Sequence, residues 1–285
     1  MSFSGASRSG GPRLPSARMN DTMHRSPQDL ADLNLLQAVR EHARWQAPCT
    51  IAEDDGVLLM AGANAFPGVF RNCVARVDAR VFPQQVLQQA QDFFAPRGRA
   101  YTVLARARRD QDLIDALHAA GMAPVADSPC MLIEAPVAAA SMQAGIRLER
   151  MTEMRHVLDA VKINAEAYEA LKLPAAEMRL FFGRPQEVLT PGVIGFVAYR
   201  GEEPVSTAMT LLSGEGAGVY WVGTATSAQR MGLGELCTRL ATNAGFASGA
   251  RVVTLQASPF GEPIYQRIGY RSYDRLLRYR FSAAA

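Results

Sequence analysis

Apolar residues recur along this chain in two patterns, one typical of helices and one typical of strands. Apolar positions spaced three and four residues apart predict amphipathic helices, and short continuous apolar runs bounded by Gly, Pro or Asp predict buried strands. The alternation of the two kinds of element indicates an α/β (α+β) protein. Helices are predicted over residues 29–43, 84–95, 110–120, 153–168, 175–182, 233–247 and 262–268, and strands over residues 57–61, 73–77, 101–105, 130–134, 146–148, 193–198, 205–212, 219–226, 252–256 and 270–281.

The order of the predicted elements occurs twice. From Cys73, and again from Val219, a strand is followed by a helix, a strand, a second helix and a third strand. The segments where the helices end are also similar: APRGRAYTVL beside FASGARVVTL, and HAAGMAPV beside QRIGYRSY. We therefore predict an internal duplication, with domains over residues 29–136 and 146–285 joined by a linker of small residues over 137–145.

The first 28 residues differ from the rest in composition. They are rich in Ser, Gly, Pro and Arg, and their four arginines and one aspartate account for the whole formal net charge of +3. We expect residues 1–28 to form a disordered basic tail. The remaining chain is formally neutral, which argues against a nucleic-acid-binding protein. No apolar run reaches the ~20 residues of a membrane span, so we expect a cytoplasmic protein, either a monomer or a homodimer.

The cysteines and histidines do not indicate a metal site. The four cysteines are scattered without C-x-x-C spacing, and the four histidines form no pair at ligand spacing with an acid between them. We expect no metal, and we expect the cysteines to be buried free thiols.

A turn with two glycines distinguishes the second half from the first. The second half has QRMGLGEL before its helix, where the first half has ARVFPQQV. Because the first turn of a helix leaves backbone N–H groups unpaired, Gly232 and Gly234 would let a phosphate approach them closely, with Arg230 beside it. The alternative is that Gly232 ends a loop and Gly234 serves packing. No lysine follows as in a P-loop, and Cys237 replaces the third glycine of the dinucleotide fingerprint.

The segment Gln229-Arg230-Met231-Gly232-Leu233-Gly234 matches the pattern Q/R-x-x-G-x-G/A, and it resembles the acyl-CoA pyrophosphate loop of the GNAT superfamily of N-acetyltransferases. The surrounding segment VYWVGTATSAQRMGLGELCTRLATNAGFASGARVVTLQAS is similar to the core of that family, and EPIYQRIGYR resembles its closing signature. The resemblance covers residues 146–281. The first half resembles the same fold without the loop. The resemblance implies two GNAT-like domains, each a mixed, mostly antiparallel sheet flanked by helices.

The resemblance also implies site residues. Acetyl-CoA would be the cosubstrate, with its pantetheine arm on backbone groups of Val222 and Thr224. Its pyrophosphate would lie on the amides from Arg230 through Met231, Gly232 and Leu233 to Gly234, with Gln229 fixing the turn or touching phosphate. Tyr265 would protonate the departing thiolate, and Ser258 would orient the cofactor or a water.

Several roles stay open at this stage. The strand before the loop carries no acid, so no general base is identified. Tyr220, Trp221 and Thr224 are candidates to line an acceptor pocket, although Trp221 better fits a core or a domain interface. Phe181 and Phe182 could cover that pocket, and ordinary core packing explains them equally well. Glu166, Tyr168 and Glu169 could recognise a cationic amine, and a solvated helix face is the simpler interpretation.

The predicted activity is transfer of an acetyl or acyl group to a primary amine of an unidentified small molecule or peptide. One alternative is a non-catalytic acyl-CoA-binding or regulatory protein. A dinucleotide-dependent oxidoreductase is disfavoured, because the third glycine and the ribose-binding acid are missing.

Overall fold

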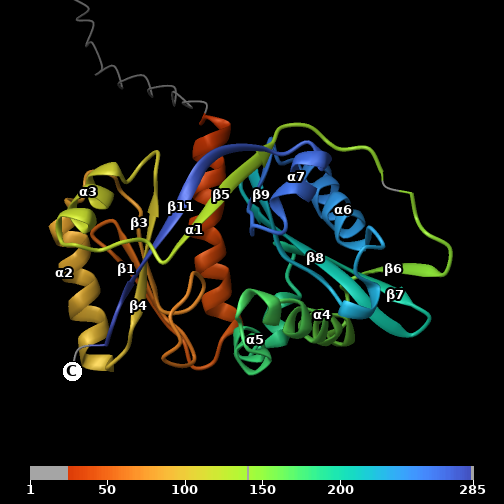
Figure 1. The fold of residues 1–285 in the computed structure, drawn as a ribbon, viewed down its shortest axis with the longest axis horizontal. Coiled ribbons are helices and arrows are strands. Elements are labelled where there is room, and N and C mark those ends of the chain that lie inside the picture. Colours follow the sequence, from red (N-terminus) through yellow and green to blue (C-terminus); the bar gives the residue numbers. More distant parts are fainter. Residues whose placement is uncertain (1–24, 140, 284–285) are drawn as a thin grey trace, which may run out of the picture.

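The computed structural model describes residues 25–139 and 141–283, and the predicted tail lies outside them except at its end (Figure 1). The helices are α1 (Pro27–Trp45), α2 (Pro83–Phe94), α3 (Gln111–Ala119), α4 (Met154–Ala167), α5 (Ala175–Phe181), α6 (Leu233–Ala247) and α7 (Glu262–Ile268). The strands are β1 (Thr50–Asp54), β2 (Val57–Ala61), β3 (Cys73–Arg76), β4 (Tyr101–Arg106), β5 (Ala126–Ile133), β6 (Ile146–Arg150), β7 (Val193–Arg200), β8 (Glu203–Ser213), β9 (Gly216–Thr224), β10 (Val252–Gln256) and β11 (Arg271–Phe281).

All of these strands belong to one open sheet, in the order β1-β2-β3-β4-β11-β5-β10-β9-β8-β7-β6. Within the described residues, β3 pairs with β4 and β9 pairs with β10 in parallel, and the other neighbours are antiparallel. The predicted fold class, an α/β protein with a mixed and mostly antiparallel sheet, is confirmed.

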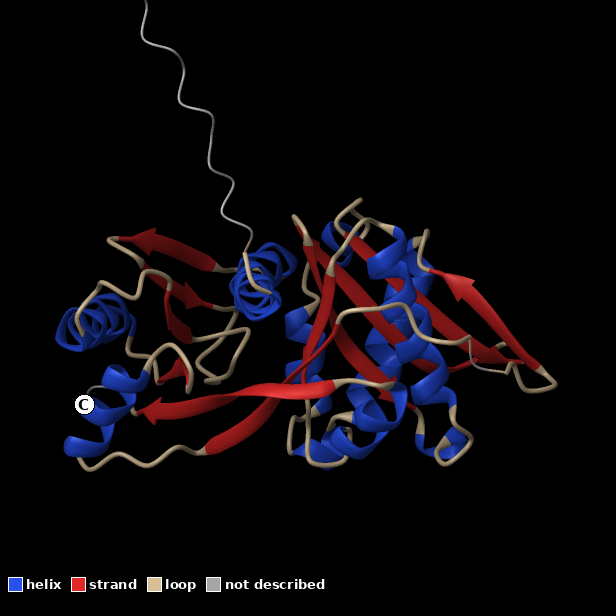
Figure 2. Ribbon diagram, turned by 90° about the horizontal axis from the view of Figure 1, so that it is seen from above, coloured by secondary structure: helices blue, strands red, loops and turns tan. Residues whose placement is uncertain are grey.

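The two halves exchange their last strands. The strand β5 follows the first half in the chain but pairs with β10, whereas β11 ends the second half and pairs with β4. The two exchanged strands also pair with each other at the middle of the sheet, where they run between the two halves (Figures 1 and 2). The element orders β3-α2-β4-α3-β5 and β9-α6-β10-α7-β11 are the same, as the duplication predicts. A continuous sheet therefore crosses the predicted domain boundary.

Helices cover both faces of the sheet, so its central strands are buried on both sides. In the second half, Met209 faces the core that includes α4 and α5, while its neighbour Ala208 faces the core that includes α6. Helix α1 lies between the halves and contributes to cores on both sides of the boundary, through Leu35 and Leu36 in one and Trp45 in another (Figure 1). Within the described part of the chain, no helix is long and apolar enough to cross a membrane.

The predicted elements are present, with differences at their ends. Helix α1 begins at Pro27, inside the segment predicted as tail, and Ser26 caps it by accepting from the amide of Asp29. Strand β5 begins four residues earlier than predicted, and the strand predicted over 219–226 runs over Gly216–Thr224. The prediction missed β1, because its sequence TIAED lies mostly exposed at the edge of the sheet and carries no apolar run.

Candidate functional site

Strand β9 separates from its parallel neighbour β10 after its first three residues. The pairing joins Gly216 through Gly218 to Val252 through Thr254 and goes no further. Beyond it, among the described residues, Val219 to Thr224 have no paired strand on that side. The Ala225 amide donates to the Val205 carbonyl of β8 at 2.9 Å. Since successive residues of a strand alternate in direction, the N–H and C=O of Thr224 point away from β8, toward the gap.

The turn after β9 presents a row of unpaired amides. The first hydrogen bond of α6 runs from the Leu236 amide to the Gly232 carbonyl, at 3.0 Å. In the part of the chain that the structure describes, the amides of Arg230 through Gly234 have no acceptor. Arg230 and Gly232 have left-handed backbones, with φ of 63° and 74°. An anion at this helix start would accept hydrogen bonds from the main chain and be favoured by the helix dipole.

The two glycines of the turn have different reasons to be glycine. Gly232 needs its left-handed conformation, and a Cβ there would meet only the Gln143 amide nitrogen, at 3.7 Å. Gly234 is crowded, because a Cβ would lie 3.1 Å from the Thr224 hydroxyl oxygen. Close packing therefore accounts for Gly234. It leaves the space above Gly232 available to a ligand.

Side chains from outside the turn hold it in place. The Glu166 carboxylate accepts from the Thr226 amide at 2.7 Å, and this hydrogen bond lowers the pKa of Glu166. Gln143, in the linker between the halves, donates to the Met231 carbonyl. Gln229 and Arg230 are exposed beside them. Glu166 is exposed, as the solvated-face interpretation predicts, and it also supports the loop through this hydrogen bond.

Tyr265 and Ser258 lie at the helix that follows β10. Tyr265 packs its ring over Gly261, where a Cβ would be 2.7 Å from the ring, and burial raises the pKa of its hydroxyl to about 12. Burial raises the pKa of the nearby Tyr168 hydroxyl, and Tyr265 adds a smaller contribution in the same direction. Ser258 accepts from the Gly261 amide at 3.1 Å and so shapes the turn into α7.

The aromatic residues of β9 pack against the first half. The Trp221 indole nitrogen donates to Nε2 of His42 at 2.7 Å, and the Tyr220 hydroxyl donates to the Asn34 side-chain oxygen at 2.8 Å. Both partners belong to α1 and are fully buried. The prediction that Trp221 packs in a core or an interface is confirmed. The sequence analysis missed His42 and Asn34, although both lie on the apolar face of a predicted helix, where a polar residue needs a partner.

In the first half, side chains fill the corresponding position. The Arg76 guanidinium, at the end of β3, is fully buried and donates to Asp110 at 3.0 Å, to Asp112 at 2.6 Å and to the Val81 carbonyl at 3.1 Å. Helix α2 starts with a proline, which has no amide to offer. The first half therefore has neither the glycine turn nor the row of free amides.

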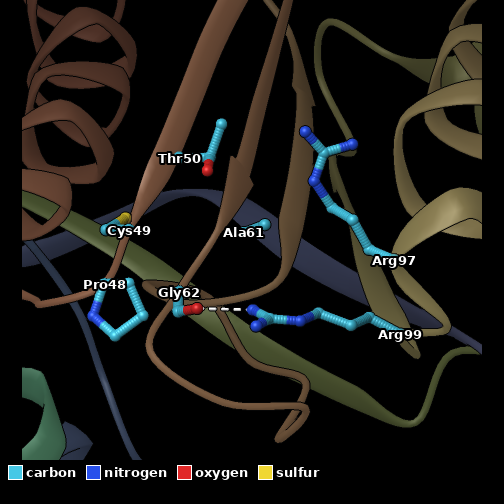
Figure 3. Close-up of a pocket in the computed structure, with 7 residues that line it drawn as sticks. All are labelled: Pro48, Cys49, Thr50, Ala61, Gly62, Arg97 and Arg99. Atoms are coloured by element: carbon cyan, nitrogen blue, oxygen red, sulfur yellow. Dashed lines mark hydrogen bonds between the residues drawn. The ribbon is translucent and has the colours of Figure 1, made fainter.

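A hollow of about 270 Å³ lies in the first half, away from the predicted site (Figure 3). Its lining includes Cys49, Arg97 and Arg99, and the Arg99 guanidinium is bonded to the Gly62 carbonyl. Burial raises the pKa of the Cys49 thiol to about 11, so the thiol is unreactive at neutral pH. None of the predicted site residues lines this hollow. Within the described residues, no group of three or more His, Cys, Asp and Glu side chains could hold a metal ion.

No family model matches the sequence, and no curated protein matches it. Solved structures match nearly its whole length. A GCN5-related N-acetyltransferase from Kribbella flavida is 20% identical, with 90% of this chain and 96% of that chain covered and a TM-score of 0.69. A GCN5-related N-acetyltransferase from Sphaerobacter thermophilus is 14% identical, with 92% and 95% covered and a TM-score of 0.61. A tandem GNAT protein from the clavulanic acid biosynthesis pathway is 12% identical, with 93% and 97% covered and a TM-score of 0.63.

These likenesses extend over both halves at once. The chain therefore has the fold of the GCN5-related N-acetyltransferases, in the tandem arrangement. The resemblance predicted from the glycine turn is confirmed at the level of fold.

Proposed function

We propose that this protein is an N-acyltransferase that transfers an acetyl or acyl group from acetyl-CoA to a primary amine. The observation that carries the proposal is the row of unpaired amides from Arg230 to Gly234 beside the free edge of β9. A diphosphate fits this turn because its oxygens accept hydrogen bonds from the unpaired amides. An arm that carries amide groups fits the free edge of β9 because its N–H and C=O groups pair with those of the strand.

Each residue then has a defined task. The backbone groups of Val222 and Thr224 receive the pantetheine amides, while the amides of Arg230 to Gly234 hold the pyrophosphate. The amine attacks the thioester carbonyl and loses a proton, and the bond from carbonyl carbon to sulfur breaks. Tyr265, whose hydroxyl is protonated at neutral pH, donates its proton to the departing thiolate and regains one from solvent.

The acceptor amine is a small molecule or a peptide. The proton released by the amine passes to water or to a side chain outside β9, because β9 carries no acid.

The test has two parts. Acetyl-CoA at 100 times its Kd stabilises the folded chain by ~2.7 kcal/mol, whereas NAD does not, and thermal unfolding measures both. A panel of amines is then screened for the release of free CoA thiol. Stabilisation with no thiol release by any amine would support a non-catalytic acyl-CoA-binding protein, and absence of stabilisation would contradict acyl-CoA binding altogether.

A further inference from the structure

Strand β9 contains a bulge between Tyr220 and Gly223, beyond Gly218, where its pairing with β10 ends. The pairing of β8 with β9 shifts register between Thr207 and Met209, and Trp221 of β9 has a left-handed φ of 54°. A bulky residue in this conformation is strained by ~1–3 kcal/mol and persists only where its surroundings hold it. The bulged residues are Trp221 and Val222, so the bulge includes one of the proposed pantetheine-binding residues and lies two positions before the other, Thr224.

Both halves contribute to the surroundings of Trp221: its ring packs against Tyr168, Phe181 and Phe182 of the second half, and its hydrogen-bond partner comes from the first half. Its indole nitrogen donates to Nε2 of His42 at 2.7 Å, while Nδ1 of His42 lies 2.6 Å from the Ala38 carbonyl. The imidazole stacks on Phe70, with ring centroids 3.9 Å apart and planes 9° apart. Burial lowers the pKa of His42 to about 3, so the ring is neutral. One nitrogen therefore donates to Ala38 and the other is left as an acceptor for Trp221.

Helix α1 also holds the strand on the near side of the bulge. Asn34 accepts from the Tyr220 hydroxyl at 2.8 Å and donates to the Leu211 carbonyl of β8 at 3.0 Å. Its side chain lies so close to Gly218 that a Cβ there would be 2.0 Å from the Asn34 oxygen. One helix of the first half thus bonds to two successive side chains of β9, Tyr220 and Trp221.

The first half supplies an internal comparison. Its equivalent strand, β3, pairs with β2 without any register shift from Cys73 to Arg76, and none of its residues has a positive φ. That strand ends at Arg76, whose side chain is bonded to Asp110 and Asp112. The bulge is therefore found in the half that has the free amides, and not in its counterpart.

We propose that His42 is a positioning residue, through which the first half holds the Trp221 bulge and thereby keeps the edge of β9 open for acyl-CoA. This inference rests on the proposed function. It assigns the first half a role in cofactor binding, although that half lacks a cofactor loop of its own.

The experiment compares acetyl-CoA affinity with stability in single variants of the full chain. His42→Leu removes the acceptor, and Trp221→Phe removes only the donor and keeps an aromatic ring. Each is expected to raise the Kd for acetyl-CoA about tenfold, measured by calorimetry. The double variant is expected to be no worse than the single ones, because both remove the same hydrogen bond. His42→Gln, which can present an acceptor oxygen, is expected to recover part of the affinity.

Tyr279→Phe is the matched control. It removes a tyrosine–histidine contact of 2.9 Å to His118, between β11 and α3, and Tyr279 is also fully buried. It is expected to lower the free energy of unfolding while leaving the Kd unchanged. If His42→Leu does not fold, Trp221→Phe decides the matter alone.

The outcomes separate the two proposals. A wild-type chain that binds acetyl-CoA, with His42 and Trp221 variants that bind it equally well, overturns the positioning role only. A loss of affinity that Tyr279→Phe reproduces in proportion to lost stability also overturns it. A wild-type chain that does not bind acetyl-CoA overturns the proposed function, and this inference with it.

Discussion

Gly232 and Gly121 have the same backbone conformation and different surroundings. Both have a φ of 74°, which an L side chain adopts only with strain; a Cβ at Gly232 would make an ordinary contact with Gln143 at 3.7 Å, and a Cβ at Gly121 would meet nothing within 4 Å. Gly232 stands among the free amides before α6, whereas Gly121 follows α3 in the first half. The pair therefore allows backbone strain to be separated from loss of the proposed phosphate site.

We expect Gly232→Val and Gly121→Val to lower the free energy of unfolding by similar amounts, ~1–2 kcal/mol each. Only Gly232→Val is expected to weaken acetyl-CoA binding, by about tenfold or more, because its side chain would occupy the space of an anion over the amides. Urea unfolding and calorimetry measure the two effects. Equal affinities of the two variants would place the pyrophosphate elsewhere.

A second residue-scale prediction concerns the proposed acid. Tyr265→Phe is expected to lower kcat by ~10²-fold or more with little change in the Kd for acetyl-CoA. Burial raises the pKa of this tyrosine to about 12, so the hydroxyl keeps its proton at neutral and mildly alkaline pH. Any alkaline decline of the wild-type rate from this group is expected to be centred near pH 12. Parallel losses of kcat and affinity in the variant would mean that the hydroxyl is not the acid.

At the scale of elements, two equivalent strand–helix junctions have opposite properties. The junction of β9 and α6 leaves amides unpaired, whereas the junction of β3 and α2 is occupied by Arg76 and its partners. Removing the Arg76 side chain from this junction would break its hydrogen bonds to Asp110, Asp112 and the Val81 carbonyl, whereas Asp110 would keep its ion pair with Arg106. The junction of β3 and α2 is therefore closed to a ligand in the folded protein.

One acetyl-CoA per chain is the expected stoichiometry. Calorimetric titration of the full chain measures it, and Arg76→Ala serves as the companion variant. This substitution is expected to destabilise the fold without creating a second binding event, because the glycine turn is absent from the first half. Two equivalents bound per wild-type chain would show that the first half also binds acyl-CoA.

At the scale of the whole molecule, the exchange of β5 and β11 makes each half depend on the other. Without the first half, β10 would lose its partner β5, and β11 would lose both β4 and β5. Unpaired strand edges of this kind promote association between chains.

Residues 146–285 produced alone are therefore expected to aggregate, and co-production with residues 1–145 is expected to restore a soluble pair. A full chain cut within the linker after folding is the control, and it is expected to stay together because the sheet pairing does not involve the linker. Size-exclusion chromatography distinguishes these cases. A monomeric, folded 146–285 fragment would contradict the dependence.

Much of this architecture could be predicted from the sequence, because apolar spacing reflects which face of an element is buried. The glycine turn could be found because two glycines stand at the start of a predicted helix, where the corresponding segment of the first half has none. The strand exchange could not be predicted, since the spacing within β5 and β11 is the same whichever strand they pair with. Two side-chain contacts could not be predicted for a similar reason. His42 lies 179 residues from its partner Trp221 in the chain, and Asp110 lies 34 residues from its partner Arg76.

The exchanged strands also bear on how a duplicated gene can change. A redundant copy is ordinarily free to decay or to be deleted. Deletion of the first half would remove β4 and β5, the strands that pair with β10 and β11, so we expect related chains to retain the first half. Among related chains, substitutions in the first half are expected to accumulate at the segment before α2 and to be rare along β4 and β5, where the other copy is completed.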